Sequence, residues 1–140
     1  RKLLWYSAYG EGWALYTESL GKELGLYTDP YQYFGMLSAE IHRAIRLVVD
    51  TGIHAKGWSR EKAIKYSLDN EAKSEEEIIS EIERYMAWPG QALSYKIGQL
   101  KIIELRNKKS KMPGFDIKQF HNAVLQPGCI PLSVLEDIIL

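Results

Sequence analysis

Apolar residues recur three or four positions apart along almost the whole of this sequence, which is the spacing of one face of an α-helix. No stretch alternates apolar and polar residues in the manner of a half-buried strand. The longest apolar pattern lies in the second predicted helix, where it predicts a core face of Tyr33, Leu37, Ile41, Ile45 and Val48. The pattern therefore predicts an all-α protein.

Capping residues and helix breakers mark the ends of the predicted helices. Gly25 is suited to end the first helix, and an aspartate or serine cap opens four later ones. Pro89-Gly90 interrupts a long apolar helical pattern. The predicted helices run from about Ser7 to Leu24, Pro30 to about Gly52, Ser59 to about Asp69, Ser74 to the Pro89-Gly90 break, Leu93 to Leu105, Asp116 to about Leu125, and from Pro131 onward.

Length and charge narrow the classes of function. At 140 residues the chain is predicted to form one helical domain, residues 1–140. Its 18 basic and 18 acidic side chains balance, so no net charge favours nucleic acid as a partner. No apolar run approaches the roughly 18 residues of a transmembrane helix. The chain lacks an initiator methionine and enters a helix almost at once, which indicates a fragment of a longer protein.

The first candidate for chemistry is Glu11, which stands between Gly10 and Gly12 in an apolar stretch, YGEGWALY. Glu18 follows two helical turns later on the same face. Two such carboxylates often form a solvated stripe. A largely buried one would instead need a cation or hydrogen-bond donors beside it.

A second candidate is the row formed by Arg46, Asp50 and His54, each four residues after the last. The row is compatible with a simple intrahelical charge ladder, or with a carboxylate that orients an imidazole. His42 is predicted to lie on a helix face and His121 in the core.

The Pro89-Gly90 break is the third unusual feature. An interior proline costs a helix roughly 3 kcal/mol, and such bends often occur where backbone curves around a site. Tyr85 and Tyr95 flank the break. Both are compatible with core tyrosines whose hydroxyls are hydrogen-bonded.

Three long motifs together resemble a known family. They are YGEGWALYTESLGKELGLYTDPYQYFGMLSAEIHRAIRLVVDTGIHAKGWSREKAI, ERYMAWPGQALSYKIGQLKIIELR and FDIKQFHNAVLQPGCIPLSVLE. They resemble the C-terminal end of a bacterial family known as domain of unknown function 885. Members of that family look like large helical zinc metallopeptidases of the gluzincin kind.

The resemblance implies roles for several residues. Glu11 matches the downstream glutamate that completes the zinc site, and Glu18 could support it from outside the ligand shell. Tyr85 or Tyr95 would donate a hydrogen bond to the developing oxyanion. Tyr85, which follows Arg84, fits the gluzincin pattern better, whereas Tyr95 lies closer to the bend. His54 and Arg46 would bind carbonyl or carboxylate groups of a peptide substrate.

This sequence departs from the family in one respect. None of its histidines belongs to an HExxH or similar arrangement, so two presumed zinc ligands and the general base are absent. We therefore expect a C-terminal part of a zincin-like metallopeptidase that binds zinc only together with the missing N-terminal part of the same protein. The alternative is a helical interaction module without catalysis. The resemblance implies a bacterial source and leaves both the cytoplasm and the cell envelope open.

Overall fold

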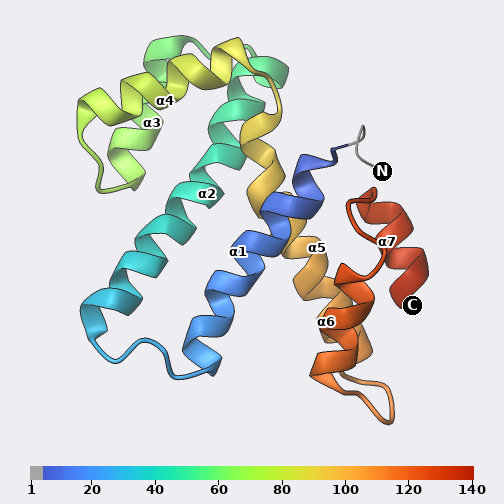
Figure 1. The fold of residues 1–140 in the computed structure, drawn as a ribbon. Coiled ribbons are helices and arrows are strands. Elements are labelled where there is room, and N and C mark those ends of the chain that lie inside the picture. The colour runs from blue at the N-terminus through green and yellow to red at the C-terminus, as the bar shows by residue number, and fades with distance from the viewer. Residues whose placement is uncertain (1–4) are drawn as a thin grey trace. The chain divides into compact units, whose positions relative to one another are not determined.

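The computed structural model describes residues 5–140, and within them the protein is all-α, as the apolar pattern predicts (Figure 1). The described residues contain seven α-helices, one short 3₁₀ helix and no strand. None of these helices combines the length and hydropathy needed to cross a membrane. The elements are α1 (Ser7–Glu23), α2 (Pro30–Lys56), α3 (Arg60–Asn70), α4 (Glu75–Ala87), η1 (Gln91–Leu93), α5 (Ser94–Lys109), α6 (Ile117–Leu125) and α7 (Leu132–Ile139).

The helices group into two compact units. Unit 1 combines the chain up to Glu18 with Ser94–Leu140, and so holds most of α1 with α5, α6 and α7. Unit 2 is Ser19–Leu93 and holds the last turn of α1 with α2, α3, α4 and η1. The prediction of a single domain did not distinguish these units.

Unit 1 is built where α1 and α5 cross. A Cβ atom built on Gly12 would overlap the backbone of Gly98 and lie 2.8 Å from the amide nitrogen of Gln99. The buried Gln99 side chain donates a hydrogen bond of 3.3 Å to the carbonyl oxygen of Leu15. The two helices therefore touch backbone to backbone. Around them pack the buried side chains of Leu15, Ile102, Leu105, Phe120, Val124, Leu135 and Ile139.

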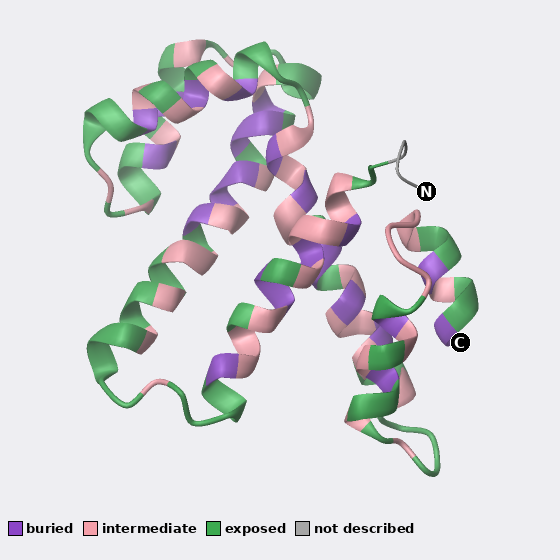
Figure 2. Ribbon diagram, in the orientation of Figure 1, coloured by how far each residue is buried: buried purple, intermediate pink, exposed green. Residues whose placement is uncertain are grey.

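Unit 2 has its own apolar core, in which α3, α4 and η1 pack against α2. In Figure 2 the buried bands of α2 lie in its second half, and its first half is mostly exposed. The buried apolar members of this core are Ile45, Val49, Ala63, Ile64, Ile78, Ile82, Tyr85 and Ala92.

The predicted helix caps are confirmed. Ser59 and Ser74 accept hydrogen bonds from backbone amides in the first turns of α3 and α4, and Asp29 and Asp116 do so for α2 and α6. The capping box at Ser74 is complete, because Glu77 accepts in return from the Ser74 amide. Gly25 adopts a left-handed conformation, φ +68°, directly after the last turn of α1.

The prediction for α2 was wrong in two respects. The helix continues through Gly52 to Lys56 and ends at Gly57, which adopts a left-handed conformation. Gly52 lies inside the helix, and its lack of a side chain lets the Trp58 ring pack against it. The predicted core face of α2 was also wrong in part: Ile45 is buried as predicted, but Leu37, Ile41 and Val48 are exposed. Because α3, α4 and η1 cover another face, the buried residues of α2 are His42, Ile45, Arg46, Val49, Asp50 and Gly52.

The apolar residues of α5 are only partly buried. Ile97 and Leu100 are exposed, whereas Ile102 and Leu105 are buried. The helix runs past its predicted end at Leu105 to Lys109.

Candidate functional site

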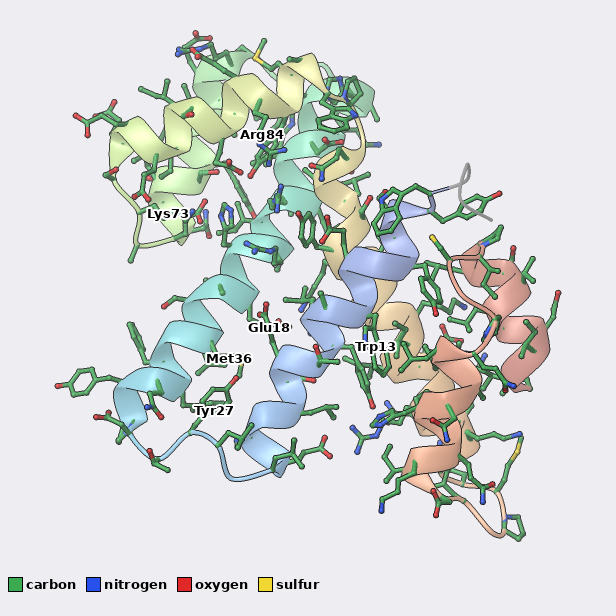
Figure 3. The ribbon with its side chains drawn as sticks, in the orientation of Figure 1. Trp13, Glu18, Tyr27, Met36, Lys73 and Arg84 are labelled. Carbon is green, nitrogen blue, oxygen red and sulfur yellow. The ribbon has the colours of Figure 1, made fainter. Side chains whose placement is uncertain are left out.

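Glu11 lies in the second turn of α1 and is half-buried. By helical spacing it stands at the margin of the buried face, next to Leu15 and away from Trp13. Trp13 points toward α6, where its ring meets that of His121 at 5.5 Å (Figure 3). No hydrogen bond or ion pair joins the Glu11 carboxylate to any residue that the structure describes, whereas Glu18 has an interaction partner.

The two glycines beside Glu11 have separate structural reasons. A Cβ on Gly10 would lie 2.9 Å from the ring of Trp5, and one on Gly12 would enter the backbone of α5. Both glycines thus allow close packing around α1, and the carboxylate between them is held on a tightly fixed helix.

Among the residues that the structure describes, Glu11 stands outside any group of metal-binding side chains. Among residues 5–140, no group of three or more histidine, cysteine, aspartate and glutamate side chains is arranged to hold a metal ion. A catalytic zinc ion commonly takes three protein ligands. Glu11 could contribute at most one of them, so the remaining ligands would have to come from further polypeptide.

Unit 2 contains a partly buried charged cluster centred on Glu81. Its Oε2 atom accepts a 2.6 Å hydrogen bond from the Tyr85 hydroxyl and a 3.0 Å hydrogen bond from Arg84. The guanidinium of Arg46 lies 3.9 Å from the same oxygen, and Nε2 of His42 lies 3.8 Å from it. Figure 3 shows Arg84 on the side of α4 that faces α2. One carboxylate thus joins two helices through four neighbours.

The cluster shifts the pKa values of its members. Burial would raise the pKa of Glu81, but the hydrogen bonds from Arg84 and Tyr85 and the charges of Arg84 and Arg46 outweigh burial and lower it to about 2. Burial and the hydrogen bond to Glu81 raise the pKa of the Tyr85 hydroxyl above its ordinary value. Tyr85 is therefore a neutral donor at physiological pH, and its proton is directed to Glu81.

Acid should weaken this cluster. The pKa of Glu81 is about 2 in the fold against an ordinary value of 4.5, so its contribution to stability is complete above about pH 4.5 and is lost as the pH falls toward 2. We expect Glu81→Gln to reduce the dependence of the free energy of unfolding on pH in this window, measured by urea denaturation at several pH values. Glu83→Gln, at an exposed ion pair with Arg60, is the control. A wild-type protein whose pH dependence matched that of Glu81→Gln would contradict this expectation.

The predicted row of Arg46, Asp50 and His54 exists as a face of α2, but its members bind different partners. The buried Asp50 carboxylate accepts a hydrogen bond from the amide of Gly90, at 3.2 Å and 3.1 Å to its two oxygens. His54 is exposed, and its Nε2 donates at 3.0 Å to the carbonyl oxygen of Tyr85. Asp50 therefore fixes the Pro89-Gly90 bend and does not orient the imidazole.

The structure separates the predicted site residues between the two units. Glu11 and Tyr95 belong to unit 1, whereas Tyr85, His54 and Arg46 belong to unit 2. Tyr85 is 2% exposed, while Tyr95 is half-buried in the first turn of α5. The role of Tyr85 or Tyr95 as the oxyanion donor stays a prediction.

Sequence reasoning missed two acidic residues, Glu81 at the centre of the cluster and Glu71, which binds the cluster member His42. Glu71 accepts from Nδ1 of the buried His42 at 2.6 Å, so His42 is an interior residue rather than a simple helix-face residue. One sequence feature could have indicated Glu81: it stands among Ile78, Ile82 and Tyr85, on the apolar side of an otherwise acidic helix.

Comparison with known proteins places the chain in a family. The model of a family described as "Bacterial protein of unknown function (DUF885)" matches residues 1–139. A crystal structure described as that of "the putative lipoprotein from Colwellia psychrerythraea" is 51% identical in sequence and superimposes with a TM-score of 0.93. The match covers 96% of this chain but only 23% of that one. No curated protein matches the chain. With its family model matched over nearly its full length, the chain belongs to the bacterial DUF885 family.

Proposed function

We propose that this chain forms part of a longer zinc-dependent peptidase and supplies Glu11 as one of its metal ligands. The observation that carries the proposal is the half-buried residue Glu11, whose carboxylate has no partner among the described residues although the helix that bears it is closely packed. Desolvating an ionised carboxylate without a partner is costly. A cation held jointly with another part of the polypeptide would offset that cost. The resemblance to gluzincin-type peptidases supports zinc as this cation.

Within the proposal, Tyr95 is the better candidate for the oxyanion donor. Tyr85 is buried, and its hydroxyl already donates to Glu81 at 2.6 Å. To serve a substrate, it would have to leave a carboxylate whose charge it stabilises. Tyr95 follows the bend that Asp50 fixes and is half-buried rather than enclosed.

The two residues proposed to bind substrate differ in their exposure to solvent. His54 is exposed, and its Nε2 is engaged by the Tyr85 carbonyl, so a neutral imidazole presents Nδ1 as an acceptor for a peptide amide. Arg46 is 4% exposed and lies over the Tyr85 ring at 5.2 Å. We propose that His54 contacts the peptide directly and that Arg46 acts chiefly by holding Tyr85 and Glu81 in place.

The tyrosine assignment can be tested with two matched variants of the longer protein. Tyr95→Phe is expected to lower turnover by about 10²–10³ with zinc retained, which is the usual cost of removing one oxyanion donor. Tyr85→Phe is expected mainly to lower the melting temperature, because Glu81 loses a donor. Turnover on a peptide, zinc content and thermal unfolding are measured for both. The assignment is wrong if Tyr85→Phe carries the loss of turnover and Tyr95→Phe does not.

Metal removal tests the proposed activity itself. The longer protein should contain about one zinc ion per catalytic site by elemental analysis and should hydrolyse peptides. Treatment with a chelator should abolish hydrolysis, and added zinc should restore it. The 140-residue chain alone should bind zinc only weakly by calorimetry. Full peptide hydrolysis by a metal-free longer protein would contradict the proposal.

A second candidate function is a helical interaction module without chemistry. It is favoured by the large apolar side chains that α2 exposes, among them Tyr31 and Phe34. Zinc-dependent hydrolysis by the longer protein would decide against this candidate. The description of the similar Colwellia protein as a lipoprotein supports the cell envelope as the location of either activity.

A further inference from the structure

One face of α2 presents an apolar stripe that nothing else in the described chain covers. The stripe consists of Tyr31, Phe34, Leu37, Ile41 and Val48, whose exposed fractions range from 83% at Tyr31 to 38% at Val48. Their spacing of three, three, four and seven residues places them along one face of the helix. Soluble proteins rarely leave a contiguous apolar surface of this kind open to water.

The stripe borders a pocket of about 550 Å³ within unit 2. Phe34, Leu37 and Ile41 form its apolar wall, and the segment from Asn70 to Lys73 between α3 and α4 forms the other side. The buried pair of His42 and Glu71 also lines it. The pocket has room for one or two bulky apolar side chains.

We propose that the α2 apolar stripe and its pocket are the docking surface for the remainder of the same polypeptide, which contributes an apolar helix or loop. The similar Colwellia protein supports this occupant, because more than three quarters of its chain lies outside the matched part. The structure supports it as well. None of the first twelve residues of α2, from Pro30 to Ile41, is fully buried, although a helix depends on tertiary packing of an apolar face for most of its stability.

This inference rests on the proposed function only in that both require a longer polypeptide.

The inference is tested by the accessibility of single cysteines in the longer protein. Cys129 is the only cysteine of this chain and is replaced by serine. Leu37→Cys probes the stripe and Leu68→Cys is its matched control, because Leu37 is 43% exposed and Leu68 on α3 is 41% exposed. Any cysteines outside this segment are also replaced, and labelling by a maleimide is followed by mass spectrometry under native and denaturing conditions.

The expected result is that the native longer protein is labelled at position 37 at least about tenfold more slowly than at position 68, with equal rates after denaturation. Equal native rates would overturn the inference. Protection at position 37 that disappears on dilution, together with loss of a dimer, would overturn it in favour of a second copy. Because labelling does not depend on zinc, a protected Leu37→Cys in a zinc-free, inactive protein would uphold the docking surface while refuting the proposed peptidase.

Discussion

Glu11→Ala in the longer protein is expected to remove bound zinc and to reduce peptide hydrolysis to background. A carboxylate that is itself a ligand has no substitute at its position, because a closely packed α1 cannot shift to bring another side chain to the ion. Zinc per protein, measured by elemental analysis, and the rate of peptide hydrolysis are the two readouts.

Glu18→Ala is the matched control for this experiment. It removes the same side chain from the same helix face, two turns further on. If Glu18 acts only from outside the ligand shell, its loss should lower metal affinity by no more than about 10–100-fold. Full zinc occupancy in the Glu11 variant, or an equal loss in both variants, would refute the assignment of Glu11 as a ligand. A circular dichroism spectrum like that of the wild type would exclude unfolding as the cause.

Gly98→Val is expected to unfold unit 1 or to weaken it severely. A Cβ at this position would overlap the carbonyl oxygen of Ala8 and lie 2.6 Å from the Cα of Gly12, so both contacts are with backbone. Overpacking a core typically costs about 1–3 kcal/mol when side chains can move aside, and here the helices themselves would have to separate. The measurement is the free energy of unfolding of the 140-residue chain by urea denaturation.

Gly35→Ala provides the contrasting result. Gly35 also lies inside a helix, but a Cβ there meets no atom within 4 Å. Alanine should therefore stabilise the chain by about 0.4–1 kcal/mol, through its lower conformational entropy when unfolded. If Gly98→Val were as stable as the wild type, the close backbone contact between α1 and α5 would not be needed for the stability of unit 1.

The sequence predicted the helices well and their partners poorly, for a physical reason. Caps such as Ser74 and breaks such as Pro89-Gly90 depend on neighbouring residues, so the sequence alone could locate them. The buried face of α2 depends on where α3 and α4 pack. Helical spacing indicated an apolar face through Leu37, Ile41, Ile45 and Val48, but only Ile45 of these four is buried, together with Val49 from outside the predicted face.

The candidate site shows the same limit. Glu11 could be selected because a long local motif surrounds it, although the absence of a partner for it among the described residues became visible only in the fold. The cluster around Glu81 could not be predicted, because its buried partner Arg46 is distant in sequence and comes from another helix. The role of Gly12 likewise required the position of Gly98.

The cluster around Glu81 also constrains how this protein can change during evolution. Losing Arg46 alone would leave a carboxylate of depressed pKa short of a compensating charge, and losing Glu81 alone would leave two guanidinium groups close together. Each single step is therefore costly, and joint replacement of Arg46 and Glu81 by apolar side chains would also require a new acceptor for the Tyr85 hydroxyl and Arg84. Homologues should accordingly keep Arg46 and Glu81 together or lose them together, so substitutions at the two positions should be correlated.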